Sequence, residues 1–515
     1  MRHSLIYLLV GFLFLPFFTK CGKDNILSVD PASVNQEDDY IANTIFDRVV
    51  DIRFSSDGDA EITGLSDSVT AVINGNDVTI TNLSSEYVQY ELSGNSTDGC
   101  FKLYSGRKQA VILNDLTLTN PNGAAINIQN KRTFLVVNGT NSLTDGATYT
   151  DTPDDEDEKA VLFSEDQLII SGDGTLSITA MGKSGIGVDD YLRILGQPTI
   201  TINVSSNAYY DNEDREYKGY AGIKINGTFI MSDGDLSITS TGTGGKGISG
   251  NGNGYFRGGT VSVNVTGNNY GNSGGWGNNS TNSVSAKGIK FDGDLSFNGG
   301  KVIVNAHAHE GIEAKGTITI TNGEVYSYSA SDDAINSGGD FTISGGYVYG
   351  RSAGNDGLDA NGDFYLKGGV VYAIGTSSPE VAIDANTEER HSLYITGGTL
   401  IAIGGLENGT SGNWSQSCYS ASSWSQNSWY AMTVDGTTWA FRTPSSGGTP
   451  LVVSGASTPI LQSGVSASNG TSHLEGLLFE NPYITGGTTV NLSSYTGGNG
   501  GGGNGPGGGG GHGPF

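Results

Sequence analysis

Carboxylate side chains recur at a fixed interval in the second half of this 515-residue sequence. They stand two residues before and one residue after an apolar residue that recurs every 23 positions, at Ile312, Ile335 and Leu358. Carboxylates brought close together repel one another unless a cation lies among them, and Ca²⁺ accepts six to eight oxygen ligands. We therefore predict calcium ligands at Glu310, Glu313, Asp333, Asp356, Asp359 and Asp384.

The alternative for these positions is a set of solvated turn residues, because Asp and Asn commonly bond to their own backbone in turns. Asn336 takes one of the positions, which suits either interpretation. The glutamates at 310 and 313 are not turn formers, and they favour calcium.

Tyrosines recur with the same spacing. Tyr326, Tyr349 and Tyr372 are 23 residues apart, with Tyr328 and Tyr347 nearby. Phenol rings repeated on an outward strip offer an apolar face and a hydrogen-bonding edge, so we predict that sugar rings stack on them. Stacked tyrosines also stabilise neighbouring strands without any ligand, and that alternative stays open.

The signs of catalysis are few. His307 and His309 alternate along one segment, but no serine or cysteine nucleophile motif accompanies them. Lys287, Lys290 and Lys315 adjoin the acidic turns and could supply the base of a calcium-dependent lyase. An ion pair between Lys290 and Glu313 explains that lysine more simply, so we predict a protein that is not an enzyme.

The elements that position these side chains are short strands. Glycines recur every 23 residues, at Gly300, Gly323, Gly346 and Gly369. Between them apolar and polar residues alternate, as in strands with one buried face. A repeat of this size must stack on its own copies to bury that face. The pattern predicts an all-β parallel β-helix, a solenoid with coils of about 23 residues.

The N-terminus has the pattern of an export signal. Arg2 and His3 precede an apolar run from Leu5 to Phe18, and Cys21 follows. We predict a signal peptide over 1–20 and lipidation of Cys21, which would anchor an exported protein to the bacterial outer membrane or cell surface. The alternative is an ordinary signal peptide with an incidental cysteine.

The remaining organisation follows from composition. We expect a polar tether at 21–45, the β-helix at 46–405, terminal coils and a cap at 406–490, and a glycine-rich flexible tail at 491–515. The formal net charge of −27 excludes nucleic acid as a natural partner, and we expect a monomer. Cys100 and Cys418 could pair, but nothing nearby in sequence decides it.

The repeats resemble a known family. Segments such as Gly338-Gly-Asp-Phe-Thr-Ile-Ser-Gly-Gly and Asn355-Asp-Gly-Leu-Asp-Ala-Asn-Gly-Asp are similar to those of bacterial carbohydrate-binding parallel β-helix proteins that bind cellulose and pectin. That family is itself similar to calcium-dependent pectate lyases. The resemblance implies a right-handed β-helix, calcium at the acidic turns, and binding of polysaccharide without cleavage.

The functional prediction is a surface lipoprotein that binds pectic polygalacturonate or a cellulose-like glycan, with calcium as its cofactor. Bridging cations would allow a negative protein to hold a negative polymer. The alternatives are a calcium-dependent polyuronate lyase and a surface adhesin whose protein partner docks on the tryptophan-rich C-terminal region.

Overall fold

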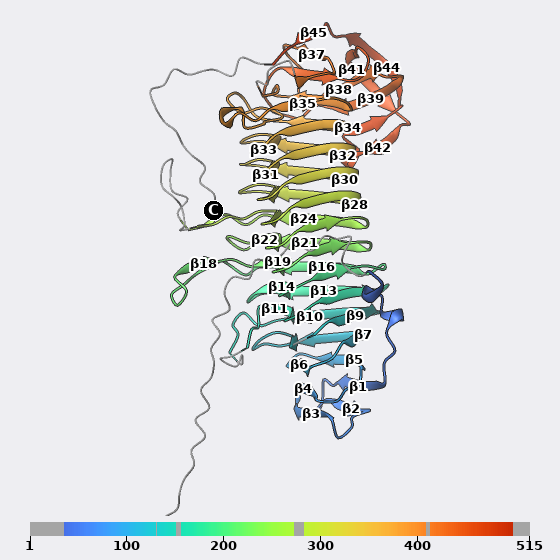
Figure 1. The fold of residues 1–515 in the computed structure, drawn as a ribbon, viewed down its shortest axis with the longest axis vertical. Helices are drawn as coiled ribbons and strands as arrows, with labels where there is room; N and C mark the ends of the chain where they lie inside the picture. The colour runs from blue at the N-terminus through green and yellow to red at the C-terminus, as the bar shows by residue number, and fades with distance from the viewer. Residues whose placement is uncertain (1–35, 130, 151–155, 272–282, 408–412, 498–515) are drawn as a thin grey trace, which may run out of the picture.

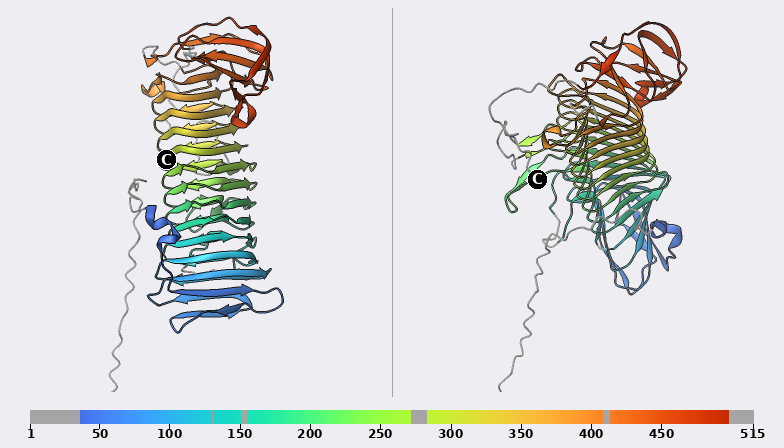
Figure 2. Two further views of the ribbon diagram at one scale, coloured as in Figure 1. Left: turned by 90° about the vertical axis from the view of Figure 1, so that its right-hand side faces the viewer. Right: turned by 45° about the horizontal axis from the view of Figure 1, so that its top comes forward.

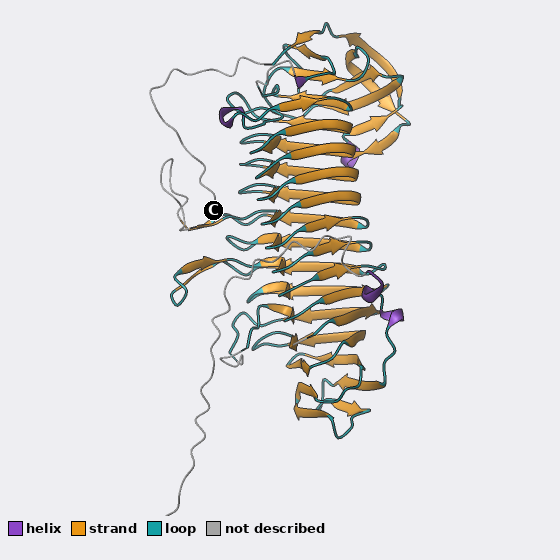
Figure 3. Cartoon of the chain, viewed as in Figure 1, coloured by secondary structure: helices purple, strands orange, loops and turns teal. Residues whose placement is uncertain are grey.

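The computed structural model describes residues 36–129, 131–150, 156–271, 283–407 and 413–497. Strands make up nearly all of the regular structure and stack in layers along the long axis of the molecule (Figures 1 and 3). In the part of the chain described, no helix is long and apolar enough to span a membrane. The predicted signal peptide, Cys21 and most of the glycine-rich tail lie outside the described residues.

One face of the stack is a 12-stranded sheet. Its neighbouring strands are parallel except for the first pair, β3 and β4. The strands are β3 (Val69–Asn74), β4 (Asn76–Asn82), β6 (Gly99–Ser105), β8 (Ile126–Gln129), β11 (Ala160–Ser164), β14 (Ser184–Val188), β19 (Ala221–Ile225), β22 (Lys246–Gly250), β27 (Ile289–Phe291), β29 (Ile312–Ala314), β31 (Ile335–Ser337) and β33 (Leu358–Ala360).

The other strands of the stack belong to a 23-stranded sheet. They are β1 (Arg48–Phe54), β2 (Glu61–Thr63), β5 (Val88–Ser96), β7 (Gln109–Thr119), β9 (Thr133–Asn138), β10 (Thr140–Thr144), β12 (Leu168–Gly172), β13 (Thr175–Ala180), β15 (Leu192–Ile194), β16 (Thr199–Val204), β20 (Phe229–Met231), β21 (Asp235–Ser240), β23 (Gly254–Phe256), β24 (Thr260–Val265), β28 (Leu295–Ala306), β30 (Ile318–Ser329), β32 (Phe341–Ser352), β34 (Phe364–Ile374), β35 (Leu393–Ile395), β36 (Thr399–Ile403), β37 (Cys418–Ala421), β40 (Leu451–Ser454) and β45 (Ser493–Tyr495).

The recurring glycines lie where the long strands β28, β30, β32 and β34 bend. Gly300 and Gly323 have φ values of 73° and 89°, in the left-handed region that glycine adopts without strain. A Cβ on Gly323 would also lie 2.7 Å from the carbonyl oxygen of Gly300 in the layer before. Both the bend and the layer spacing therefore require glycine here.

The core lies between the sheets and is filled by alternate residues of each strand. In β28, Val302, Val304 and Ala306 are at most 2% exposed, and the residues between them are partly exposed. Aromatic rings stack from layer to layer, as Phe256 and Phe297 do with centroids 4.9 Å apart. The alternating pattern thus fixes which side chains face outward, where the candidate site lies.

The predicted fold class, a right-handed parallel β-helix solenoid of about 23-residue coils, is corrected by these sheets. The structure is all-β, with a 12-stranded, mainly parallel sheet and many additional strands, some of them antiparallel, such as β1 with β2 and β36 with β40. The 23-residue spacing holds from Ile289 to Leu358, but Ile186 and Ile223 are 37 residues apart because a hairpin lies between them. The repeat therefore describes only one part of the chain.

A six-stranded antiparallel sheet covers the C-terminal end of the stack (Figures 1 and 2). It consists of β38 (Trp429–Val434), β39 (Thr437–Arg442), β41 (Ile460–Ser468), β42 (Thr471–His473), β43 (Leu478–Glu480) and β44 (Tyr483–Thr489), with the short 3-10 helix η5 (Leu474–Gly476). Cys418 precedes this sheet in the chain, and both it and Cys100 are free thiols.

At the N-terminal side, the described part of the predicted tether packs on the stack. The 3-10 helices η1 (Gln36–Asp39) and η2 (Ile41–Asn43) lie there. Another short 3-10 helix, η3 (Thr387–Glu389), precedes β35 in the chain. The buried Asp39 carboxylate is 2.8 Å from Arg193 Nη1 and 3.0 Å from Arg132 Nη1. These ion pairs hold residues 36–43 against the layers.

Candidate functional site

One outward-facing position of the 12-stranded sheet changes sign along the stack. From one strand to the next, the register pairs Lys224 of β19 with Ser249 of β22, then Ser249 with Lys290 of β27, and Lys290 with Glu313 of β29. The same column then continues through Asn336, Asp359, Asp384 and Glu407, the last two by single bridges at Ile383 and Leu406. The column is basic in the earlier layers and acidic in the later ones.

A second column, three residues earlier in each layer, changes sign at the same place. It contains Lys246 and Lys287, followed by Glu310, Asp333 and Asp356. Glu310, Asp333 and Asp356 are all buried, and each of these residues is only 5–7% exposed. The structure therefore brings the predicted metal ligands together along one face, in two adjoining rows.

Lys287 neutralises the first two carboxylates. Its Nζ lies 3.1 Å from Glu310 Oε2 and 2.6 Å from Glu313 Oε2. Burial opposes the ionisation of Glu310, but Lys287 and His309 outweigh it and lower the pKa of Glu310 to about 2. These two predicted ligands already have a cation of the protein beside them.

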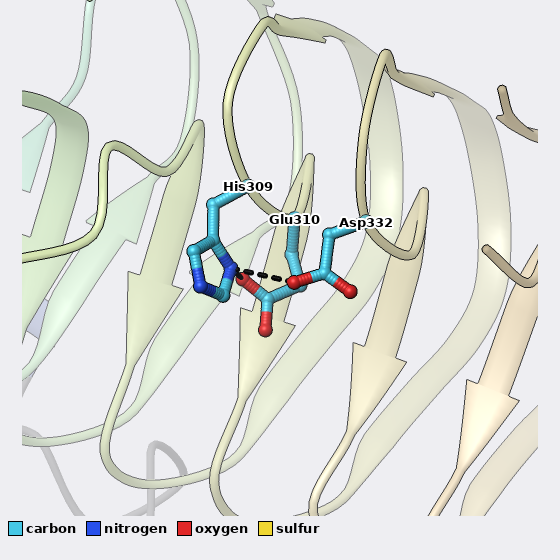
Figure 4. A group of neighbouring side chains, drawn as sticks. All are labelled: His309, Glu310 and Asp332. Carbon is cyan, nitrogen blue, oxygen red and sulfur yellow. Dashed lines mark hydrogen bonds and ion pairs between the residues drawn. The ribbon is translucent and has the colours of Figure 1, made fainter. Parts of the chain in front are cut away.

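His309 contributes a second positive charge in this layer (Figure 4). Its Nδ1 contacts the Glu310 carboxylate and lies 2.8 Å from Asp332 Oδ2. Burial disfavours the imidazolium, but the two carboxylates outweigh it and raise the pKa of His309 to about 9. The three groups are close enough to hold a metal ion, but the imidazole would first have to lose its proton.

The later carboxylates have no such partner among the described residues. Asp384 lies against both Glu407 and Asp359, and one of its oxygens, Oδ1, is buried without a hydrogen bond. Burial, followed by the neighbouring carboxylates, raises the pKa of Asp384 to about 11 and that of Asp356 to about 8. Asp356 and Asp384 are therefore held in their protonated forms, and no cationic side chain among the described residues lies beside them to favour ionisation.

The chemistry of these residues fits calcium. Asp359, Asp384 and Glu407 place carboxyl groups next to one another along the column, and the buried Asp384 Oδ1 has no hydrogen-bond partner among the described residues. Ca²⁺ binds the ionised form of such groups, so its binding would release their protons. Asn336 donates one hydrogen bond of 2.7 Å to Asp359 and another of 3.1 Å to Asp333, which orients both carboxylates. Burial is the main cause of the raised pKa values and the neighbouring carboxylates add to it, so a cation here would favour ionisation of these groups.

The tyrosines do not form an exposed strip. Tyr326 and Tyr349 do stack, with ring centroids 4.7 Å apart, but Tyr349 and Tyr372 are only 2% and 0% exposed. The six-stranded sheet covers them, and the Tyr372 hydroxyl donates a hydrogen bond to the carbonyl of Arg442. Tyr347 stacks on His473 of the same sheet. The expectation of an outward platform is corrected by a covering sheet distant in sequence.

Tyr328 lies outside this covered group and is half-buried, with the Arg351 guanidinium 5.3 Å from its ring centroid. Of the predicted sugar-binding tyrosines, Tyr326, Tyr328 and Tyr347 keep some exposure, and binding by them stays a prediction. Two tryptophans of the C-terminal region also pack within the protein: Trp439 is 6% exposed, and the Trp414 indole donates a hydrogen bond to the carbonyl of Leu393.

Sequence reasoning missed Glu407 and the cationic role of His309. Leu406 stands 23 residues after Ile383, so the repeat continues for one more layer than the sequence prediction included. Glu407 occupies the acidic column of that layer. His309 gave no such signal, because only the folded turn places it beside Glu310 and Asp332.

With this geometry established, similarity to known proteins can be stated. A family described as "Carbohydrate-binding domain-containing protein" matches residues 74–357. The chain belongs to this family. The matched segment of this carbohydrate-binding family includes the lysines and the first acidic layers, whereas Asp359, Asp384 and Glu407 follow its end. Membership fits a binding protein rather than an enzyme.

Other comparisons add less to the carbohydrate-binding assignment. No curated protein matches the chain. A solved structure described as a polysaccharide lyase-like protein from C. thermocellum, in a gadolinium derivative, is 20% identical, with a TM-score of 0.36. The similarity covers 61% of this chain and 98% of that one.

Proposed function

We propose that this member of the carbohydrate-binding family binds an acidic polysaccharide such as pectic polygalacturonate, with calcium at the acidic end of the column. The observation that supports this most is the contiguous set Asp359, Asp384 and Glu407, which has a buried oxygen without a hydrogen bond and no cationic side chain beside it in the part of the chain that the structure describes. Calcium there would stiffen the turns and could share its remaining coordination positions with carboxylates of the glycan.

The formal charge of −27 makes a cation bridge the natural way to hold a negative polymer. A neutral, cellulose-like glycan remains the second candidate ligand, because the family description specifies no charge. The two classes of ligand differ in one testable respect, since only the acidic glycan should require calcium.

The alternative of a polyuronate lyase loses its expected bases. Lys287 is paired with Glu310 and Glu313, and Lys290 and Lys315 lie 2.6 Å and 3.0 Å from Asp292 Oδ1. Burial disfavours the Lys287 ammonium, but the two glutamates outweigh it and raise the pKa of Lys287, which opposes a role as a base. Lys290 and Lys315 are engaged with a carboxylate of the protein itself. We propose binding without cleavage.

Affinity electrophoresis tests the function directly. Gels containing polygalacturonate, its fully methyl-esterified form or a neutral β-glucan would be run with calcium and with a chelator. We expect the strongest retardation by polygalacturonate in the presence of calcium, and weaker, calcium-independent retardation by its methyl ester. Equal migration in all gels would overturn the proposal. A rise in ultraviolet absorbance from an unsaturated product on incubation with polygalacturonate would instead establish a lyase.

We also propose that the protein is exported and anchored through a lipid on Cys21, on the support of the apolar run from Leu5 to Phe18 that precedes it. Metabolic labelling with a fatty-acid analogue should mark the wild-type protein and not Cys21→Ala. Equal labelling of the two proteins would refute lipidation at this residue.

A further inference from the structure

Two antiparallel strand pairs, here termed hairpins, adjoin the lysine-bearing layers. The first consists of β17 (Tyr209–Asp211) and β18 (Glu216–Lys218), and Figure 1 shows it leaving the stack at the level of β19. The second pairs β25 (Tyr270–Gly271) with β26 (Ser283–Val284). The rings of Tyr217 and Tyr270 join the two hairpins, with centroids 6.0 Å apart.

The first hairpin carries a group of tyrosines. Tyr210 packs against Tyr217 with centroids 4.9 Å apart, and Tyr209 stacks on Tyr220 at 5.8 Å. Tyr209 and Tyr210 are 39% and 40% exposed. Unlike the covered tyrosines near the C-terminus, these rings offer surface to a ligand, and sugar rings stack on such surfaces.

The hairpin is held in place by its own ion pairs. Lys218 Nζ lies 2.8 Å from Asp211 Oδ2 and also contacts the Asp214 carboxylate. Lys218 thereby links its own strand to the turn of the hairpin. A ligand would meet a surface that needs little ordering on binding.

Lys246 lies at the base of both hairpins. A Cβ placed on Gly219, just after β18, would be 3.7 Å from Lys246 Nζ and 2.7 Å from Val284 Cγ1 of β26. The backbone N–H of Lys246 donates a hydrogen bond of 3.0 Å to the carbonyl of Tyr220. The ammonium group and the tyrosine group therefore belong to one local structure.

Lys246 and its neighbour Lys224 have no anion of their own. Neither forms an ion pair or a side-chain hydrogen bond with another residue that the structure describes, in contrast to Lys287 and Lys290. Burial, with the nearby lysines Lys287, Lys290 and Lys224 adding to it, lowers the pKa of Lys246 to about 7, although Glu313 opposes this. Enclosed amines without a counter-ion are stabilised by a bound anion.

We propose that Lys224 and Lys246 bind the carboxylate of an acidic sugar residue while Tyr209 and Tyr210 pack against its ring. This inference rests on the proposed function and specifies a second contact for the same polymer, separate from the calcium end. All four residues lie within the segment that the carbohydrate-binding family matches.

The test compares three variants with the wild-type protein. Lys224→Gln/Lys246→Gln removes the charges, Tyr209→Ala/Tyr210→Ala removes the rings, and Lys315→Gln changes a lysine that is 43% exposed and paired with Asp292. Calorimetric titration would use polygalacturonate and its methyl ester, both in calcium. Melting curves without glycan would verify folding, and the Lys→Gln variant should melt no lower than the wild type, because it loses two unpaired buried charges.

We expect the lysine variant to lose at least tenfold in affinity for polygalacturonate and to bind the methyl ester as the wild type does. The tyrosine variant should lose affinity for both, and Lys315→Gln should change neither. Unchanged affinity of the lysine variant for polygalacturonate would overturn this inference while leaving the proposed function standing. Absence of wild-type binding to every acidic glycan would overturn both.

Discussion

The lysine-bearing layers and the carboxylate-bearing layers of the 12-stranded sheet share one backbone arrangement and differ in charge. Lys290 and Glu313 occupy paired positions in neighbouring strands, so the sign changes within a single step of the stack. Where the two regions meet, Lys287 compensates Glu310 and Glu313. Away from the junction, Lys246 at one end and Asp384 at the other lack a counter-charge in the described structure.

The difference teaches that the regular scaffold sets positions and the residue type at each position sets the chemistry. At the junction the charged side chains compensate one another, so this region is structural. The basic end is suited to bind an anion, and the acidic end is suited to bind a cation. An acidic polymer with calcium supplies both partners. Changes at the junction and at each end should affect the stability of the protein by different amounts.

The largest effect is expected at the junction. Lys287→Met leaves Glu310 and Glu313 buried without their partner, and loss of one member of a buried ion pair costs about 3–5 kcal/mol. Urea unfolding should show that loss, and Lys287→Met/Glu310→Gln/Glu313→Gln should recover most of it. A loss no greater than that of Lys315→Gln would mean that the junction does not depend on this charge pairing.

Calcium should have the next largest effect, confined to the acidic end. At a calcium concentration 100 times its dissociation constant, binding stabilises the folded protein by about 2.7 kcal/mol. The melting temperature of the wild type and of Asp235→Asn, an exposed acid on the other sheet, should rise with calcium. Asp359→Asn/Asp384→Asn should respond little. A rise of equal size in all three proteins would place calcium elsewhere.

The smallest effect for a single step of the measurement, one pH unit, is a pH dependence at the basic end. The pKa of Lys246 is about 7 in the folded protein, against 10.5 ordinarily, so the unfolded chain binds more protons between these values. Without glycan, stability should therefore rise with pH across this window, by at most about 1.4 kcal/mol per pH unit from this group. Lys246→Gln should remove that slope. If the stabilities of the wild type and of Lys246→Gln changed equally with pH, the Lys246 ammonium would not be enclosed without a partner.

Much of the acidic end could be predicted from the sequence. Period and alternation placed Glu310, Asp333 and Asp356 in one column, because strand register follows from spacing alone. The predicted right-handed parallel β-helix was wrong, since the chain forms a 12-stranded, mainly parallel sheet with many additional strands, some of them antiparallel.

Other features needed the folded chain. Nothing local in sequence says that residues 429–489 fold back over Tyr349 and Tyr372, or that Lys287 reaches Glu310. The base of the two hairpins depends on contacts between Gly219, Lys246 and Val284, which are distant in sequence. Long-range packing of this kind is not encoded in a repeat.

The central claim is that calcium at the acidic end supports binding of an acidic polysaccharide. The most direct measurement is the affinity for polygalacturonate of the wild type, Asp359→Asn/Asp384→Asn and Asp235→Asn, each with calcium and with a chelator. We predict that calcium strengthens binding by the wild type and by Asp235→Asn at least tenfold and has no effect on the double variant. Equal, chelator-insensitive affinity in all three proteins would contradict the account.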